Sequence, residues 1–384
     1  MLFLFYMSYL FTSESVTCGH PDKICDQVSD SILDALLAQD PNSKVAVDTW
    51  VKDNTLGLIG EITTSAIIDF EKIARHTVNK IGYNRDDLGF NGNNFEFISR
   101  IGLQSKEIDQ AVIKSDDKDL GAGDQGIMFG YATKQTKELM PLPIILAHLF
   151  AKNLHNLRLK LEAQDDFRLR PDGKTQVTIE YSDDHKIEKI HTILISSQHS
   201  DKISQSELKD LLIEEVIVPT LKAQNLQEYC QNPRFLINPS GSFILGGPVA
   251  DSGLTGRKIV VDSYGGWSRV GGGAFSGKDS TKVDRSSAYI ARYIAKQLVA
   301  KNFADNLELQ LSYSIGKAEP TSVSVFGNLN KSSQEILKYI SDNFDLRPGK
   351  IISELGLNKP IFEATATYGH FGQVDKNFSW EKTS

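Results

Sequence analysis

The 384-residue sequence contains few cysteines and no run of basic residues, and these absences exclude several classes of protein. Its three cysteines, Cys18, Cys25 and Cys230, cannot form a disulfide framework, and no pair of them has zinc-finger spacing. We therefore expect reduced thiols and a cytoplasmic location. The net charge of -7, without a basic helix face, argues against a nucleic-acid partner, because such proteins neutralise many backbone phosphates. A local cluster of Lys and Arg is still able to bind a small anion.

The sequence also lacks an apolar run long enough to span a bilayer. The apolar start, residues 1–11, is shorter than the roughly 20 residues that a membrane helix needs. It has no basic leading segment and no small-residue cleavage site, so we expect neither a secretory signal nor a membrane partner. Met7 is an alternative start, which would leave residues 9–11 as the beginning of a strand. The length indicates two or three lobes.

A hairpin pattern recurs in each third of the chain. The paired segments are residues 44–51 with 56–64, 176–181 with 187–196, and 309–315 with 321–326. Stretches with apolar residues at intervals of three and four indicate helices at residues 22–38, 66–81, 144–161, 207–223, 283–300 and 332–343. Because hairpins outnumber strand–helix–strand crossovers, we predict an α+β fold of three similar repeats, with mixed or antiparallel sheets and helices packed on one face. The approximate repeat boundaries are 7–105, 121–240 and 241–384.

The first predicted helix begins in a motif suited to anions. Pro21 fits the first helical position, and the free N–H groups and dipole at that end attract negative charge. His20 and Asp22 at this turn are therefore candidates for ligand and metal contacts. Aspartates then recur every four residues as far as Asp34, and because like charges at this spacing repel, we interpret Asp30 and Asp34 as a solvated face. The core stripe of the helix consists of Ile24, Val28, Ile32 and Leu36.

Residues 238–280 are rich in glycine and serine around one short predicted strand, residues 258–262. Long irregular loops of this kind are usually functional. The cations in and just after this region are Arg257, Lys258, Lys278 and Lys282. Glycine loops with spaced cations suit a polyphosphate, and solvated surface lysines are the weaker alternative.

Two other glycine patterns carry less information. The cluster at residues 121–126 fits a structural turn as well as a close backbone approach to a ligand. Residues 272–278 match part of a Walker A loop, but Asp279 stands where Ser or Thr is required. The predicted strand before this loop also ends about ten residues too early for that motif, which argues against an ordinary P-loop NTPase.

Eight short blocks, in order, make the sequence resemble the methionine adenosyltransferase family. They are FTSES, GHPDKICDQ, GEITT, GAGDQG, MFGYAT, LRPDGK, GLTGRK and GGGAFSGKDSTKVDRS. The match runs from about Leu10 to near the C-terminus. The resemblance implies three intertwined α/β repeats, ATP and L-methionine as substrates, two Mg²⁺ ions per site and K⁺. It also implies a homodimer with shared active sites, assembled into a dimer of dimers.

The resemblance further implies a role for each matching residue. The catalytic residues would be His20, Lys174, Arg257, Lys258, Lys278 and Lys282. All of these except Lys282 would also bind ATP, together with Asp172, Ser242, Phe243, Asp251 and Ala274. Methionine would be held by Glu61, Gln104, Asp251 and Lys282, and residues 104–114 resemble the family's mobile active-site loop. Asp22 and Asp284 would bind Mg²⁺, and Asp48 would bind K⁺.

Four residues depart from the family pattern. Asp48 and Cys18 each stand in place of a usual Glu, Ser242 replaces an Arg, and Val270 replaces a common His. None of these changes removes a phosphate or Mg²⁺ ligand, so we expect activity with an altered ATP affinity or K⁺ response.

Two alternative functions remain to be weighed. A non-catalytic regulatory subunit of the same fold would be free to lose catalytic residues, yet the set from His20 to Asp284 is intact. A generic phosphotransferase would release ADP, whereas adenosyl transfer with loss of tripolyphosphate would not.

Overall fold

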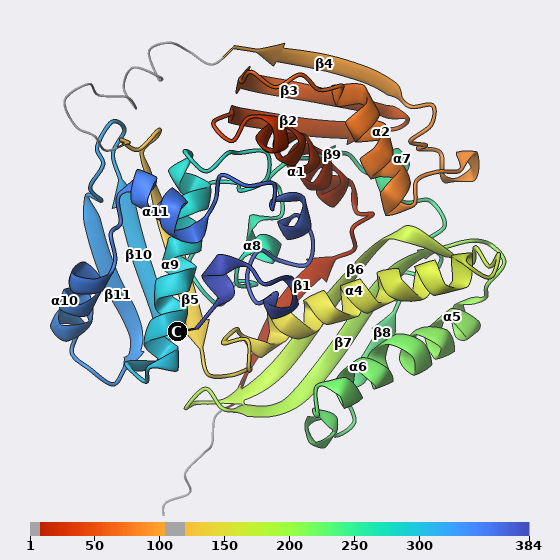
Figure 1. Cartoon of the computed structure of the whole chain (residues 1–384). Coiled ribbons are helices and arrows are strands. Elements are labelled where there is room, and N and C mark those ends of the chain that lie inside the picture. The colour runs from red at the N-terminus through yellow and green to blue at the C-terminus, as the bar shows by residue number, and fades with distance from the viewer. Residues whose placement is uncertain (1–7, 104–119, 384) are drawn as a thin grey trace, which may run out of the picture.

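The computed structural model describes residues 8–103 and 120–383, and its strands form three sheets (Figure 1). The first has the order β1-β6-β7-β8, with bounds Ser8–Val16, Leu169–Ser182, Ile187–His199 and Arg234–Ile237. The second has the order β11-β10-β5, with bounds Ser322–Leu329, Ala304–Tyr313 and Gly126–Thr133. The third has the order β4-β3-β2-β9, with bounds Glu96–Gly102, Thr55–Thr63, Lys44–Lys52 and Gly253–Leu254.

Each sheet combines strands from different thirds of the chain. β1 pairs antiparallel with β6, β5 pairs antiparallel with β10, and β9 pairs antiparallel with β2. Parallel pairing joins β3 to β4 and β7 to β8, so two of the sheets are mixed and the third is antiparallel. The predicted α+β fold with three intertwined repeats is confirmed, and the three predicted hairpins correspond to β2–β3, β6–β7 and β10–β11.

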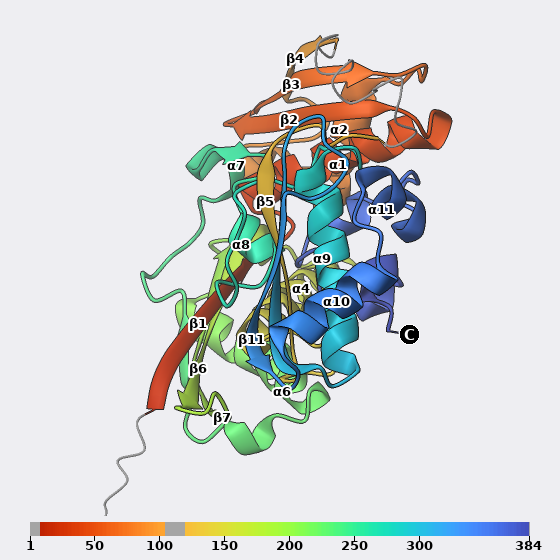
Figure 2. The same cartoon turned by 90° about the vertical axis from the view of Figure 1, so that its left-hand side faces the viewer.

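The longer helices lie where the apolar periodicity predicted them. Their bounds are α1 Pro21–Gln39, α2 Phe70–Ile81, α4 Leu142–Glu162, α9 Val283–Ala300 and α10 Ser333–Asn343. α1 packs on β2, α4 on β1 and β6, and α9 on β5 and β10. Figure 2 shows α9 and α10 on the same side of β5 and β11. Shorter helices are α7 Gly247–Ala250, α8 Ile259–Asp262 and α11 Pro348–Leu355.

The predicted helix at residues 207–223 is interrupted. It consists of α5 (Gln205–Leu212), a π-helical turn (Ile213–Ile217) and α6 (Val218–Ala223). Pro219 has no amide hydrogen to bond the carbonyl four residues earlier, and a wider turn before it accommodates that loss.

Two predictions about local structure are wrong. Residues 258–262 form not a strand but a helical turn, α8, in which the Asp262 N–H donates to the Lys258 carbonyl at 2.8 Å. The β-branched run there favours a strand only where a neighbouring strand can pair with it, and here Asp262 is bound by Lys23 of α1 instead. The acidic residues of α1 are not a solvated face, because Asp30 is 0% exposed and Asp34 is half-buried.

The apolar residues form two cores. One lies between α4 and the β6–β7 hairpin, and the other joins the N-terminal third to the C-terminal third through α1, β2, α9 and β10. The core stripe predicted for α1 is buried in the second core. Cys18, Cys25 and Cys230 are all free thiols, as expected. No helix in the described part of the chain has the length and apolar character of a membrane span.

Candidate active site

The N-terminus of α1 places His20 at the centre of the candidate site. His20 is the N-cap of the helix and Pro21 the first helical residue, as predicted. The Nδ1 atom of His20 accepts the Asp22 N–H at 3.2 Å, so a neutral ring carries its proton on Nε2. Burial, followed by the nearby charge of Lys258, lowers the pKa of His20 to about 3. His20 is therefore a neutral hydrogen-bond donor at neutral pH.

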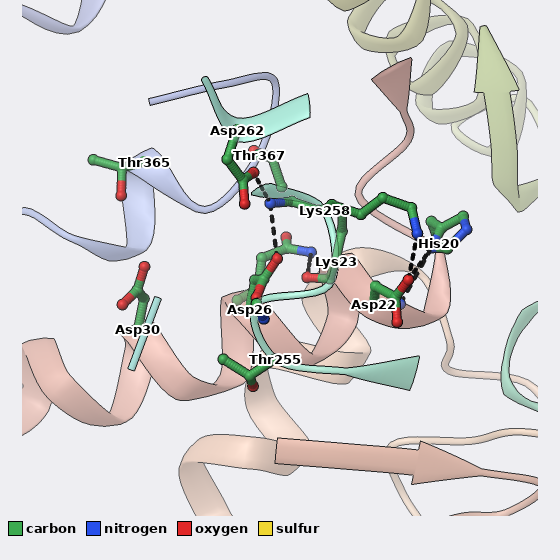
Figure 3. A network of polar contacts seen from close by, with 12 residues as sticks. His20, Asp22, Lys23, Asp26, Asp30, Thr255, Lys258, Asp262, Thr365 and Thr367 are labelled. Atoms are coloured by element: carbon green, nitrogen blue, oxygen red, sulfur yellow. Dashed lines mark hydrogen bonds and ion pairs between the residues drawn. The ribbon is translucent and has the colours of Figure 1, made fainter. Parts of the chain in front are cut away.

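Asp22 and Lys258 form an ion pair beside His20 (Figure 3). The Lys258 Nζ atom lies 2.5 Å from Asp22 Oδ2, and the Leu254 N–H donates to Asp22 Oδ1 at 3.0 Å. Burial alone would raise the pKa of Asp22, but the hydrogen bonds from Lys258 and Leu254 bring it below its ordinary value. Asp22 is thus an ionised carboxylate that is only 4% exposed.

The residues proposed to contact the nucleoside lie close to His20, on the side where β6 begins. Asp172 is buried, accepts the Gly247 N–H at 2.9 Å, and burial raises its pKa to about 6. The backbone of Phe243 is bonded to His199 in both directions, with N–H to Nε2 at 3.1 Å and carbonyl to N–H at 3.0 Å. Asp172 and Phe243 lie on either side of Gln198. The Asp172 N–H donates to the Gln198 side chain, and Gly246 lies against both Gln198 and the Phe243 ring. Ser242 is exposed.

A second group of candidates is held against β2. The Val47 N–H donates to the Gly277 carbonyl at 3.0 Å, and the Asp279 N–H donates to the Val45 carbonyl at 3.0 Å. Lys278 therefore lies beside β2. The Lys278 Nζ atom pairs with Asp284 Oδ2 at 2.6 Å.

Lys282 pairs with Asp279 at 2.7 Å. Asp48 and Glu61 lie on one face of the same sheet, because Glu61 pairs with Ala46, two residues before Asp48. Burial, opposed by the charge of Lys278, raises the pKa of Asp48. The candidate K⁺ ligand and the candidate methionine ligand therefore lie near Lys278.

The loops that carry Lys258 and Lys278 contact each other at glycine residues. A Cβ atom on Gly256 would collide with the Ala274 Cβ, so the loop that carries Lys258 touches the loop that precedes Lys278. Gly273 likewise leaves no room for a side chain, since its Cβ would collide with the carboxylate of Asp284. These glycines therefore allow segments of the protein to pack closely in this region.

Three further predicted residues have exposed side chains. The side chains of Arg257 and Lys174 make no hydrogen bond or ion pair with any residue in the described ranges. The charge of Lys174 nevertheless lowers the pKa of both His20 and Asp172, so Lys174 belongs to the group around His20. Asp251 is exposed at the end of α7, where its Oδ1 accepts the N–H of Ser252 at 2.9 Å. Gln104 and the loop predicted at residues 104–114 lie outside the described residues.

The carboxylates fit Mg²⁺ that is also bound by phosphate. Within residues 8–103 and 120–383 there is no group of three or more His, Cys, Asp or Glu able to hold a metal. Mg²⁺ commonly takes one or two carboxylates and completes its shell with water and substrate phosphates. Asp22 and Asp284 each offer such a carboxylate next to a lysine, so both suit a phosphate-bound ion.

Several buried charged residues of the site were not identified from the sequence. Lys23 contacts Asp26 at 2.9 Å and Asp262 at 2.5 Å, and all three are at most 2% exposed. Arg285 is 0% exposed. The available signal was their position: Lys23, Asp26 and Arg285 are charged residues inside the matched blocks that had no assigned ligand.

Comparisons with known proteins agree on one family. The models of the N-terminal, central and C-terminal domains of S-adenosylmethionine synthetase match residues 8–106, 119–243 and 245–382. The chain is 51% identical to an S-adenosylmethionine synthase of Pseudothermotoga lettingae over 388 aligned residues, covering 98% of this chain and 96% of that protein. It is 50% identical to an S-adenosylmethionine synthase of Petrotoga mobilis over 390 residues, covering 97% and 96%.

Proposed function

The chain belongs to the S-adenosylmethionine synthetase family, and on that basis we propose that it is a methionine adenosyltransferase that makes S-adenosylmethionine from ATP and L-methionine. The observation that carries this proposal is that a chain matching all three family domains brings His20, Asp22 and Lys258 together at the N-terminus of α1. A helix N-terminus with adjacent cations is an anion site, and tripolyphosphate is the anion that this reaction releases.

The first chemical step needs positioning more than proton transfer. The methionine sulfur is a neutral thioether with no proton to remove, so it requires no general base. It must attack the ribose C5′ in line with the departing oxygen, and holding two reactants in that alignment supplies roughly 7–11 kcal/mol. The C–S bond forms as the C5′–O bond breaks, and the bonding electrons leave with the tripolyphosphate.

The cations stabilise that leaving group. Arg257 and Lys174 have no ion pair with described residues, so their charge is available to a phosphate. Lys258 and Lys278 bring two more cations, and His20 offers its Nε2–H. Preorganised charge that meets developing negative charge usually contributes more to catalysis than any other effect. The same pocket then hydrolyses tripolyphosphate to pyrophosphate and phosphate.

The remaining candidates orient the two substrates. We assign Glu61, Asp251, Lys282 and Gln104 to methionine, where the carboxylates suit its ammonium group. We assign Asp172, Ser242, Phe243 and Ala274 to the nucleoside. Support comes from their placement, because Phe243 and Asp172 both flank Gln198 while Glu61 lies on the face of β2–β3 nearest Lys278.

The family is metal-dependent, and for this chain we propose two Mg²⁺ ions held by Asp22 and Asp284, with K⁺ at Asp48. Bound Mg²⁺ would neutralise negative charge on the phosphates and so make tripolyphosphate a better leaving group. Asp22 is kept ionised by its hydrogen bonds, which is the state a cation ligand needs.

We propose a cytoplasmic homodimer with shared active sites, assembled as a dimer of dimers. The free cysteines support a reducing compartment. Exposed apolar residues on strands of all three sheets support an open sheet face as the contact surface; they include Leu10 on β1, Ile59 on β3, Ile127 on β5 and Phe326 on β11.

The product mixture tests the proposal. The purified chain is supplied with ATP, methionine and Mg²⁺, with and without K⁺, and its products are identified by mass spectrometry. S-adenosylmethionine, pyrophosphate and phosphate in equal amounts are expected. Release of ADP would instead support a phosphotransferase, and no turnover by the chain alone would support a regulatory subunit.

A further inference from the structure

The acidic stripe of α1 binds backbone amides from the C-terminal third of the chain. Each aspartate in the stripe, at every fourth position, accepts at least one N–H of a distant segment. The pairs are Asp22 with Leu254 at 3.0 Å, Asp26 with Gly256 at 2.8 Å, Asp30 with Gly277 at 2.8 Å, and Asp34 with Phe362 and Glu363 at 2.9 and 2.8 Å. The mutual repulsion of these carboxylates is offset by the donors, so the stripe acts as a set of attachment points along one helix.

Asp26 attaches the first cation-bearing loop. Its Oδ1 accepts the N–H of Gly256, the residue directly before Arg257 and Lys258. Its Oδ2 accepts from Lys23, which also bonds Asp262 at the far end of α8 (Figure 3). The short segment that carries both cations is therefore fixed to α1 on both sides.

Asp30 attaches the second loop in the same manner. The N–H of Gly277, directly before Lys278, donates to Asp30 Oδ1. Arg285 binds both oxygens of Asp30 at 2.7 and 2.8 Å and donates to the Lys278 carbonyl at 3.1 Å. The Gly277 N–H and the Lys278 carbonyl are thus both held by one buried ion pair.

These hydrogen bonds fix the positions of loops that packing alone would leave poorly fixed. Glycine-rich segments lose much conformational entropy on folding and bring few side chains to pack, so packing fixes them poorly. A displacement of about 1 Å in a charge that contacts the reacting group can cost about 100-fold in rate. We propose that Asp26 and Asp30 are positioning residues that set the places of Arg257, Lys258 and Lys278 for the tripolyphosphate. The inference rests on the proposed function.

Asp34 provides a matched control within the same helix. It accepts two backbone N–H groups, just as Asp26 accepts two donors, and in each case an asparagine can satisfy only one of the pair. The segment that Asp34 holds, residues 362–363, contains no proposed ligand of ATP, methionine or metal. A purely structural role would therefore make the loss of tripolyphosphate affinity follow the loss of Tm in both Asp26→Asn and Asp34→Asn.

The experiment compares Asp26→Asn, Asp30→Asn and Asp34→Asn with the wild type. Calorimetry with Mg²⁺ and the imido analogue of tripolyphosphate, whose P–N–P links resist hydrolysis, gives the affinity for tripolyphosphate. Steady-state kinetics give kcat and the KM for methionine, and thermal unfolding gives Tm. We expect the first two variants to bind tripolyphosphate at least about tenfold more weakly and to lose kcat by a similar or larger factor. Their KM for methionine should stay within about twofold, and Asp34→Asn should bind tripolyphosphate like the wild type.

Equal effects in all three variants, or losses that follow Tm alone, would overturn the inference. If Asp30→Asn does not fold because Arg285 keeps an unpaired buried charge, Asp26→Asn and Asp26→Glu carry the test. A folded Asp26→Glu with wild-type tripolyphosphate affinity would also overturn it. Wild-type protein that binds tripolyphosphate but makes no S-adenosylmethionine would remove the proposed function and leave the affinity comparison valid.

Discussion

Lys258 and Asp22 are 236 residues apart in the chain, yet the Lys258 Nζ atom lies 2.5 Å from Asp22 Oδ2. This contact joins the start of α1 to the first glycine-rich loop. It places a proposed phosphate ligand and a proposed Mg²⁺ ligand next to each other and next to His20. The site therefore exists only when the N-terminal and C-terminal thirds of the chain are folded together.

Lys278→Ala should reduce turnover by at least about 100-fold, because it removes one preorganised positive charge that would stabilise the leaving group. Steady-state kinetics of S-adenosylmethionine formation measure the effect. Lys134→Ala is the matched control, since Lys134 makes an ion pair of the same 2.6 Å length with Asp305 but has no proposed ligand role. Near wild-type rates in Lys278→Ala would remove Lys278 from the mechanism.

Asp48→Glu should show an equal or stronger response to added K⁺. The longer side chain restores the family's usual residue at a position that lies near Lys278 and Glu61. The measurement is the rate as a function of K⁺ concentration, with total ionic strength held constant. A flat titration in both proteins would exclude this position as a K⁺ ligand.

Stability should fall as the pH falls below about 6.5, partly because of His148. Burial, with a smaller effect of Lys23, lowers the pKa of His148 from 6.5 to about 3. Between these values the unfolded chain binds a proton that the folded chain does not, so stability is full above pH 6.5 and is lost toward pH 3. The slope contributed by one such histidine is about 1.4 kcal/mol per pH unit.

Urea unfolding at several pH values between 7 and 5 measures this dependence. His148→Gln should have a shallower slope than the wild type, whereas His76→Gln, at an exposed position on α2, should not. Equal slopes in the wild type and His148→Gln would contradict the prediction.

The cysteines should differ in their reactivity toward iodoacetamide. Burial raises the pKa of all three thiols, but Cys230 is only partly buried, whereas Cys18 and Cys25 are at most 5% exposed. Cys230 should therefore be alkylated first, as peptide mapping of a time course would show. Modification of Cys18 ahead of Cys230 would show that the turn before His20 opens readily.

Local patterns were sufficient to predict the hairpins and the main helices. β2–β3 and α1 have clear periods of two and of three to four, and their boundaries differ from the prediction by at most one residue. Residues 258–262 were wrongly predicted as a strand because their β-branched composition favours one, whereas in the structure they form a helical turn whose Asp262 bonds Lys23 of α1.

The carboxylates of α1 show why the rest of the site could not be predicted. From its neighbours alone, Asp30 is one of a series of repelling charges, and exposure is the natural expectation. Its partner, Arg285, lies 255 residues away, and no local pattern connects the two. The proposed ligand-binding residues were identified through short sequence blocks, whereas the residues that hold those blocks in place could be identified only in the folded chain.

The most direct test of the central claim follows the bond that breaks. ATP is labelled with oxygen-18 at the oxygen between C5′ and the α-phosphorus and is converted in the presence of methionine and Mg²⁺. Displacement at C5′ predicts that all of the label leaves in the inorganic phosphates and that S-adenosylmethionine contains none. Label retained on the 5′ oxygen of a nucleoside or nucleotide product would show that a P–O bond broke instead, and would contradict the account.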